Sequence, residues 1–464
     1  MRDLILILVL LVSFSTSADN QWINPLQPNP LTFTGYGDGI ANMGQWLVVG
    51  DPLNDDIDID TGTVYVYQNQ NGEWLLYQTL YANDADARDE FGSVVDIEIY
   101  HPTGETWIVV SALKDDEGGL DNGAVYAFQL DMNGDFTQYN KFLGESNTIS
   151  QNFGTSLALN YDYISEIDAK LWILAIGDNY KRLPYGPNDP NAGSNHSTGG
   201  VDIYKKLEGL ENQFWEQEPV QMGTGYLDAL DSTDFVGTSV SVEGKYMLAG
   251  APGDDSHELG TDGIDTGAMH FLFRDNLTQT WSCCSIVKAP NLDRGARFGE
   301  DVEVIKQPGS NRVLMASAPF EDAGTNVQKG AVYVYYNSAF VQKLEPTNTD
   351  GGQGQHFGGA IAANGDEFYG STEFLVGAPF SEDKKGRIYH YTVNPDFDGS
   401  NDFYIKKEDI VAFNRDEYPW DTGQFGINVS TDGLNHATSS KSNYIGNHKS
   451  VYTKESPIFI NGFE

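Results

Sequence analysis

The chain has 464 residues, of which 40% are hydrophobic and 12% aromatic, so it can bury a large core and is not globally disordered. Its 67 acidic residues outnumber 27 basic ones, which gives a formal net charge of −40. A field of this sign repels nucleic acid and anionic membrane surfaces, so we expect no nucleic-acid partner. It favours cations or basic partners, and it also serves solubility in salty surroundings.

The N-terminal segment has the pattern of a secretory signal peptide. Arg2 precedes an unbroken apolar run from Leu4 to Val12, and small residues follow up to Ala18. The run is too short to span a bilayer as a helix, and we expect residues 1–18 to be removed by cleavage after Ala18. No later segment is a candidate membrane span. The mature chain is therefore expected to be secreted or at the cell surface, without membrane insertion.

An aromatic–glycine pair recurs at a nearly constant spacing along the remaining chain. The pairs are Tyr36-Gly37, Phe91-Gly92, Phe153-Gly154, Phe298-Gly299, Phe357-Gly358 and Phe425-Gly426, with Phe235-Val236-Gly237 as a one-residue variant. Such self-similarity is the signature of a repeat architecture. We predict seven repeats, which start near residues 33, 91, 153, 235, 298, 357 and 425.

Each repeat contains four segments rich in β-branched and aromatic residues, bounded by Gly, Pro, Asn and Asp. The first follows the aromatic–glycine pair, as in FGSVVDIEI (91–99), and the second is an apolar run into Gly-Ala-Pro, as in EFLVGAP (373–379). The third begins with Gly, as in GAVYVY (330–335), and the fourth is variable, as in EWLLYQTL (73–80). Helical periodicity is nowhere sustained. These features predict an all-β protein, a seven-bladed β-propeller with four-stranded antiparallel blades.

The Phe-Gly pair, the Gly-Ala-Pro stop and the GAVYVY-type segment together resemble FG-GAP repeats, the unit of the integrin α-subunit N-terminal propeller and of many bacterial exported proteins. The resemblance covers about residues 33 to 452. It implies one propeller domain over residues 19–455, followed by a C-terminal tail over 456–464. It also implies that the loop-rich face of the propeller is the one that binds partners.

The sequence departs from the integrin pattern at the connection between the first and second segments. Integrin repeats carry a calcium loop there, of the form Asp-x-Asp/Asn-x-Asp/Asn-Gly. Here the connections read ANMGQW (41–46), VEGKY (242–246) and IKQPGSNR (305–312), and none has the alternating oxygen ligands of a calcium site. The chain is therefore similar to the bacterial exported type that lacks these loops, and we expect that no cofactor is required for folding.

Acidic residues gather instead in the connection after Gly-Ala-Pro. Asp56, Asp58 and Asp60 place alternate carboxylates on one side of an extended segment and could hold Ca²⁺. The alternative is that they are solvated acids that initiate turns through side chain to backbone hydrogen bonds. Asp254 and Asp255 lie in the corresponding loop of the fourth repeat, and we count them as candidate binding residues.

The third repeat carries the longest insertion, residues 177–200. A loop of this length in a compact domain is usually functional or disordered. Tyr180, Lys181, Arg182 and Tyr185 form a basic and aromatic group on an otherwise acidic face, which predicts a binding site. A plain flexible insertion is the alternative.

Local catalytic signatures are missing from the sequence. It contains no His-Glu-x-x-His, no Gly-x-Ser-x-Gly and no Gly-Lys-Ser/Thr motif, and we assign no catalytic residue. We therefore expect a monomeric, non-enzymatic recognition or adhesion protein that binds an extracellular protein or glycan. The alternative is a carbohydrate-active or other hydrolytic enzyme that uses a carboxylate pair on a propeller scaffold.

Three smaller features complete the pattern. Cys283 and Cys284 are adjacent, so they form either a strained vicinal disulfide or two thiols in a strand. The last repeat lacks a fourth segment, and we expect residues from Trp22 to Leu26 to supply the outer strand of the last blade. The terminal SPIFINGFE (456–464) is either a sorting tag or the end of the last strand.

Overall fold

The structure is a computed structural model that consists of strands joined by turns and loops. It describes Leu26 and residues 35–144, 152–165, 168–184, 195–208, 214–218, 234–255, 265–275, 280–307, 311–322, 328–346, 354–363, 373–381, 386–394, 404–410, 426–432, 435–441 and 449–455. Among these residues, no helix has the length and apolar character needed to cross a membrane. The predicted all-β class is confirmed.

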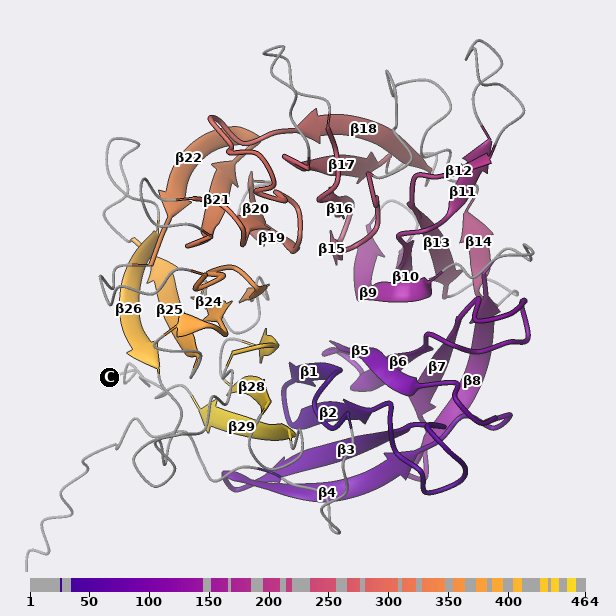
Figure 1. Ribbon diagram of the computed structural model, residues 1–464. Helices are drawn as coiled ribbons and strands as arrows, with labels where there is room; N and C mark the ends of the chain where they lie inside the picture. The colour runs from indigo at the N-terminus through magenta and orange to yellow at the C-terminus, as the bar shows by residue number, and fades with distance from the viewer. Residues whose placement is uncertain are drawn as a thin grey trace, which may run out of the picture.

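Six four-stranded antiparallel sheets stand around a central axis as the blades of a β-propeller (Figure 1). The strands of each blade are paired in chain order, and in blade 3 a separate two-stranded sheet, β11 (Arg182–Pro184) and β12 (Asn195–Ser197), is inserted between the second and third strands. The strands are β1 (Ile40–Met43), β2 (Trp46–Asp51), β3 (Thr63–Gln70) and β4 (Glu73–Leu80) in blade 1; β5 (Phe91–Tyr100), β6 (Glu105–Ala112), β7 (Ala124–Leu130) and β8 (Phe136–Leu143) in blade 2; β9 (Phe153–Ile164), β10 (Ala169–Asp178), β13 (Gly200–Leu207) and β14 (Glu216–Glu218) in blade 3; β15 (Val240–Glu243), β16 (Tyr246–Ala251), β17 (Ala268–Arg274) and β18 (Trp281–Val287) in blade 4; β19 (Val302–Gln307), β20 (Asn311–Ala318), β21 (Ala331–Tyr336) and β22 (Ala339–Leu344) in blade 5; and β23 (Ala360–Ala363), β24 (Glu373–Ala378), β25 (Arg387–Val393) and β26 (Tyr404–Ile410) in blade 6.

A three-stranded sheet, called here the last sheet, lies between blade 6 and blade 1. It consists of β27 (Val429–Thr431), β28 (Asn435–Lys441) and β29 (Lys449–Glu455), and β27 contacts both β1 and β23. The described structure therefore has six four-stranded blades, not the seven that the sequence predicts. The reason is that the last repeat has no fourth segment of its own, and residues 22–25, expected to supply it, lie outside the described residues.

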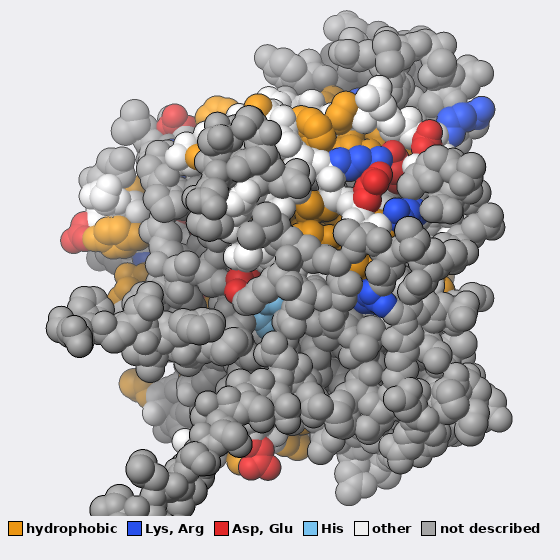
Figure 2. All heavy atoms as spheres, turned by 90° about the vertical axis from the view of Figure 1, so that its left-hand side faces the viewer, with side chains coloured by type: hydrophobic (Ala, Val, Ile, Leu, Met, Phe, Trp, Pro, Cys, Tyr) orange, Lys and Arg blue, Asp and Glu red, His pale blue; other side chains and the backbone are white. Residues whose placement is uncertain are grey.

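The second strand of each blade is buried on both faces, as its continuous apolar run predicts. Every residue of β2, β10 and β16 is buried. Because these strands lie between neighbouring blades, their side chains join apolar clusters that extend across each junction. On the outside, viewed from the side of β22 and β26, charged side chains of both signs lie next to one another among apolar ones (Figure 2).

The three recurring motifs meet at one point of each junction. Gly62, which starts the third segment of blade 1, forms a parallel bridge with Phe91 of blade 2. A Cβ atom on Gly50 would come within 1.9 Å of the Gly92 carbonyl oxygen, and Gly92 itself has a φ of 102°. Only glycine permits both the close approach and this backbone conformation. The Phe-Gly pair of one repeat therefore packs directly against two glycines of the preceding repeat, here Gly50 and Gly62.

Two-residue turns join the first and second strands in two of the blades. Met43 pairs with Trp46 across Gly44 and Gln45, and Glu243 pairs with Tyr246 in the same way. This is the connection that carries the calcium loop in integrin repeats. In blades 1 and 4 a turn of this length leaves no room for such a loop.

Asparagine side chains close the ring between the last sheet and blade 1. Asn428 Nδ2 donates to the carbonyl oxygens of Gly37 (3.0 Å) and Asp38 (2.9 Å). Asn42 Nδ2 donates to the Asn435 carbonyl oxygen at 3.1 Å, and Asn435 Nδ2 donates to the Gly44 carbonyl oxygen at 2.9 Å. The two ends of the described chain are thus held together by side chain to backbone hydrogen bonds.

Candidate functional site

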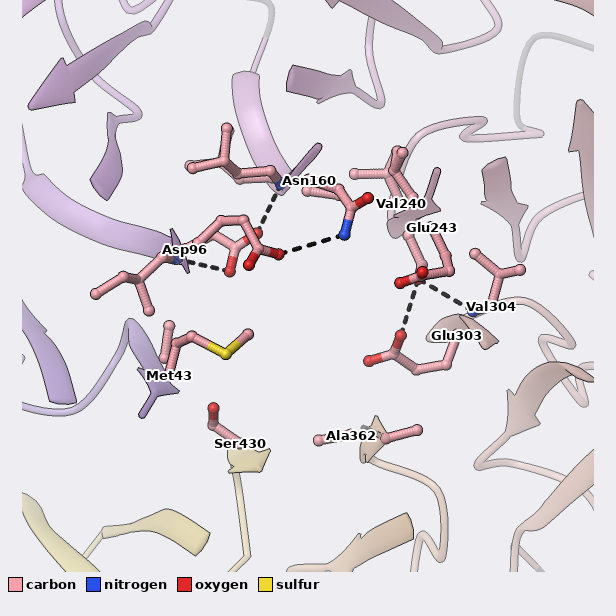
Figure 3. Close-up of a pocket in the computed structure, with 18 of the residues that line it drawn as sticks. Met43, Asp96, Asn160, Val240, Glu243, Glu303, Val304, Ala362 and Ser430 are labelled. Atoms are coloured by element: carbon pink, nitrogen blue, oxygen red, sulfur yellow. Dashed lines mark hydrogen bonds between the residues drawn. The ribbon is translucent and has the colours of Figure 1, made fainter. Parts of the chain in front are cut away.

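The first strands of the blades enclose a cavity of about 490 Å³ on the axis of the ring (Figure 3). Its walls come from β1, β5, β9, β15, β19, β23 and β27. Met43, Gly244 and Ala363 also line it, and these residues end first strands or belong to the turns that follow. The cavity therefore lies toward the end of the ring at which the first and second strands are joined.

The described lining of the cavity is acidic. None of its residues is Lys or Arg. Five carry carboxyl groups: Asp96, Glu98, Asp162, Glu243 and Glu303. Asp162 is paired with Arg274, which approaches from β17 outside the lining. A cationic group that enters the cavity would be attracted by those carboxyl groups that are ionised.

Asp96 links blade 2 to blade 3. Its Oδ1 accepts a hydrogen bond from the backbone of Ile97 (2.8 Å), and its Oδ2 accepts one from the backbone of Leu159 in β9 (2.7 Å). Burial raises the pKa of Asp96 to about 7, although the two hydrogen bonds act in the opposite direction. The side chain thus bridges the first strands of two blades.

Asp301, just before β19, makes the same link between blades 5 and 6. Its carboxyl oxygens accept hydrogen bonds from the backbone of Val302 (3.0 Å) and of Ile361 in β23 (2.7 Å). Burial raises the pKa of this carboxyl to about 7 as well. Two junctions of the ring therefore depend on a buried carboxyl group.

Two serines take the corresponding place at other junctions. Ser241 Oγ accepts from the backbone of Val304 in blade 5 at 3.0 Å and donates to Glu303 Oε2 at 2.8 Å (Figure 3). Burial, reinforced by the charges of Asp301 and Asp96, raises the pKa of Glu303 well above its usual range. Ser430 in the last sheet accepts from the backbone of Asn42 in blade 1 (2.9 Å). Ring closure thus uses the same bond as the interior junctions.

The three acids of the first Gly-Ala-Pro loop differ in their contacts, and one of them, Asp58, makes a local bond to the backbone. Asp58 Oδ1 accepts from the Ile59 backbone at 2.7 Å, Asp56 Oδ2 accepts from the Tyr81 hydroxyl at 3.4 Å, and Asp60 has a φ of 50°. In the described part of the chain, the metal-ligating side chains that converge in threes do not include Asp56, Asp58 or Asp60. Calcium binding at this loop stays a prediction.

Asp254 is buried and forms an ion pair with Lys288 at 2.9 Å, whereas Asp255 accepts a hydrogen bond from the Asp265 backbone at 2.6 Å. Asp254 follows the last alanine of β16 by three residues. Asp115 and Glu321 occupy the same position after β6 and β20, and they pair with Lys141 and Lys343. This repeated ion pair was not predicted from the sequence; its signal is an acid at a fixed distance after the Gly-Ala-Pro strand.

The long insertion of blade 3 is partly described. Lys181 is buried, and its Nζ lies 2.5 and 2.6 Å from the carboxylate oxygens of Asp202, so it serves a pair within the blade. Tyr180 is 42% exposed and packs edge-on against Phe235. Arg182 begins the hairpin of β11 (Arg182–Pro184) and β12 (Asn195–Ser197), but its side chain and Tyr185 lie outside the described residues. A binding role for this group stays a prediction.

The geometry shows the class of protein, which is a β-propeller. Its blades are antiparallel sheets, and the first strands of the blades surround an acidic cavity. Residues 74–128, which run from the fourth strand of blade 1 through most of the third strand of blade 2, match the FG-GAP repeat. Together, the match and the arrangement of the blades support an FG-GAP β-propeller. No curated protein matches it.

Proposed function

We propose that this protein is an exported recognition or adhesion protein that binds a protein or glycan through the loop-rich end of the propeller. The observation that carries the proposal is a set of exposed apolar side chains on the loops that follow the second strands of blades 1 and 2. Ile57, Ile59 and Leu120, called here the loop surface, are 54%, 56% and 72% exposed. Exposed apolar groups on functional loops are typical of binding surfaces.

Both loops border the connection between β4 and β5, residues 81–90: the Lys114 backbone of the second loop donates to the Asp89 carbonyl oxygen. The Arg88 backbone donates to the Ile59 carbonyl oxygen, and the charges of Asp60 and Asp121 both act on Glu90, whose pKa is raised chiefly by burial. Apolar side chains therefore stand among carboxylates on this surface. The partner that fits it presents apolar groups together with basic ones, in line with the net charge of the chain.

A pair of variants tests the loop surface. Ile57→Ser with Ile59→Ser should abolish binding to a glycan array and to a panel of basic, apolar peptides. Leu75→Ser with Leu76→Ser is the matched control, since both side chains are exposed on the outer strand β4. Equal loss in both variants, or no loss in either, would reject the loop surface as the binding site.

One observation favours an enzyme as the second candidate. Asp96, Asp301 and Glu303 lie in or beside the cavity, and burial raises the pKa of each. Carboxyl groups with raised pKa values in a cleft are typical of catalytic sites, although structural networks produce them too. Turnover of a polysaccharide that Glu303→Gln abolishes without a change in melting temperature would replace the first proposal with this one.

The proposal includes a complete ring of seven blades. Its support is Leu26, which packs against the apolar cluster that contains Trp74 of blade 1 and Ala437 of the last sheet. Export and a monomeric state belong to the proposal as well, on the strength of the N-terminal sequence and the closed ring. Deletion of residues 19–28 should destabilise the ring and promote aggregation, whereas deletion of residues 456–464 should have little effect. The opposite result would assign the missing strand to the C-terminus.

A further inference from the structure

The junction between blade 6 and the last sheet holds three side chains that ligate metals in other proteins. Glu373 is the first residue of β24, His390 lies on β25 and His436 on β28. Their ligand atoms all lie within 4.8 Å of one another. Both imidazoles are almost fully buried, so the three groups face one another inside the ring.

Two of the three distances between these groups are close to those of a tetrahedral ion site. Glu373 Oε2 lies 2.8 Å from His390 Nε2 and 3.6 Å from His436 Nε2. Zinc binds imidazole nitrogen and carboxylate oxygen at about 2.0–2.2 Å, which places neighbouring ligand atoms about 3.3 Å apart. The two observed distances lie on either side of this value, so small side-chain movements would seat an ion.

A second contact fixes the orientation of His436. Its Nδ1 lies 2.8 Å from the hydroxyl oxygen of Thr431, the residue directly opposite it on β27. When Nδ1 carries the proton and donates it to this hydroxyl, Nε2 presents its lone pair toward Glu373. Metal-ligating histidines are commonly held in this way through their second ring nitrogen.

Strand register shows which residues take the same places at the junction of blades 4 and 5. Ala378 pairs with Arg387 as Ala251 pairs with Ala268, which aligns Glu373 with Tyr246 and His390 with Phe271. The Gly426 amide donates to the Ser439 carbonyl as that of Gly299 donates to Ser317. This alignment of β28 with β20 places His436 where Leu314 stands.

The equivalent places at five other junctions are apolar, and each set of three belongs to one buried cluster. The sets are Trp46, Val66 and Ile108; Trp107, Ala127 and Leu174; Ile173, Ile203 and Met247; Tyr246, Phe271 and Leu314; and Val313, Val334 and Phe374. Polar groups in such a place cost free energy unless they are bonded to one another or to a ligand. The exchange of carbon for two imidazoles and a carboxylate therefore sets this junction apart from the other five, and the three groups are those that ligate metals.

We propose that Glu373, His390 and His436 bind a divalent transition-metal ion, Zn²⁺ by the chemistry of the donors. Two imidazole nitrogens and one carboxylate oxygen suit zinc, whereas calcium takes oxygen ligands almost exclusively. Blade 6 supplies two ligands and the last sheet supplies one. The ion fastens the last sheet to the ring, and it takes the place of the proton between His390 and Glu373 when it binds.

Metal titration of the full chain tests the proposal. After treatment with a chelator, the protein should bind one Co²⁺ with the absorption of a tetrahedral site, and Zn²⁺ should displace it and raise the melting temperature. His390→Gln and His436→Gln should each weaken Zn²⁺ binding by more than about 100-fold, since loss of an outer hydrogen bond alone costs 10- to 100-fold. His101→Gln, in the turn after β5, is the control and should bind as the native chain does.

A triple variant keeps the test decisive if the single variants fail to fold. Glu373→Tyr, His390→Phe and His436→Leu together copy the apolar set of blades 4 and 5. This variant should fold, bind no Zn²⁺ and melt at the same temperature with and without the ion. Stoichiometric Zn²⁺ binding by the triple variant, or no binding by the native chain, would overturn the proposal and leave a hydrogen-bonded triad.

Discussion

The junction of blades 4 and 5 and the junction of blade 6 with the last sheet share one backbone design and differ in side-chain chemistry. A Cβ atom on Gly250 would approach the Gly299 carbonyl oxygen to 2.0 Å, and one on Gly377 would approach that of Gly426 to 2.1 Å. The first junction then fills its centre with carbon, whereas the second fills it with nitrogen and oxygen. The repeat motifs thus determine how blades dock, and they leave the chemistry between the blades free to change.

The largest effect is expected from moving polar chemistry into the apolar junction. Leu314→His should lower the free energy of unfolding by about 3–5 kcal/mol, because it removes packing and buries an imidazole among Tyr246, Phe271 and their neighbours. Urea unfolding measures the loss. Leu314→Met should cost less than about 1.5 kcal/mol. A tolerated histidine would mean that the two junctions are interchangeable.

The next effect separates the junctions held by carboxyl groups from those held by serine. The pKa of Asp96 and of Asp301 is about 7 in the folded protein, above the value of about 3.9 in an unfolded chain. The folded state therefore binds the proton more tightly, so the stabilisation is complete below pH 4 and is lost as the pH rises through 7. The free energy of unfolding should fall on the order of 3 kcal/mol for each carboxyl across this range.

Unfolding in urea at several pH values between 5 and 8 measures this slope. The double variant Asp96→Asn, Asp301→Asn should flatten it, whereas Asp135→Asn, at an exposed turn, should leave it unchanged. A slope that persists in the double variant would assign the pH dependence to other groups, of which the buried Glu303 is the first to examine.

A smaller effect tests whether the two backbones are indeed alike. Gly250→Ala and Gly377→Ala should each cost about 1–3 kcal/mol, because the added methyl group meets a carbonyl oxygen that is fixed in the next sheet. Thermal and urea unfolding should give similar losses for the two variants. A loss of stability confined to Gly250→Ala would show that the last sheet can shift to accommodate the added methyl group, whereas blade 5 cannot.

The smallest effect concerns the hydrogen bonds between first strands. Ser241→Ala and Ser430→Ala each leave a backbone N–H without its partner, on Val304 and Asn42 respectively, and each should cost about 1–2 kcal/mol. Equal losses of unfolding free energy in urea would show that the closing junction contributes as much to stability as an interior junction does. No measurable loss for Ser430→Ala would mean that the asparagine contacts alone close the ring.

The fold was largely predictable because its signals are local and repeated. The Phe-Gly pair, the Gly-Ala-Pro run and the glycine of the third segment recur in order, and their physical reason is the contact they make with one another. The number of four-stranded blades was not predictable in the same way. The last repeat has no fourth segment of its own, and a local motif does not show which residues would complete its sheet.

The candidate sites were harder to predict, because their residues come from different strands. Glu373, His390 and His436 are spread over 64 positions and show no metal-binding spacing; only the register of three strands brings them together. The surroundings of Lys181 could not be predicted for a different reason. A lysine in a long, polar loop suggests exposure, but Asp202 on the neighbouring strand pairs with it inside the blade.

The asparagine bonds that close the ring have a consequence for how the protein is made. They join residues 390 or more positions apart, such as Asn428 to Asp38 and Asn42 to Asn435. Contacts between such distant residues form late, because a long loop must close before they contribute.

At 5–20 residues per second, synthesis of the chain takes about 20 to 90 s. For nearly all of that time the last sheet has not yet been synthesised, so the face of blade 1 that it covers is exposed to other chains. Correct assembly of the ring therefore requires that the last repeat is completed before the first repeat associates with other chains.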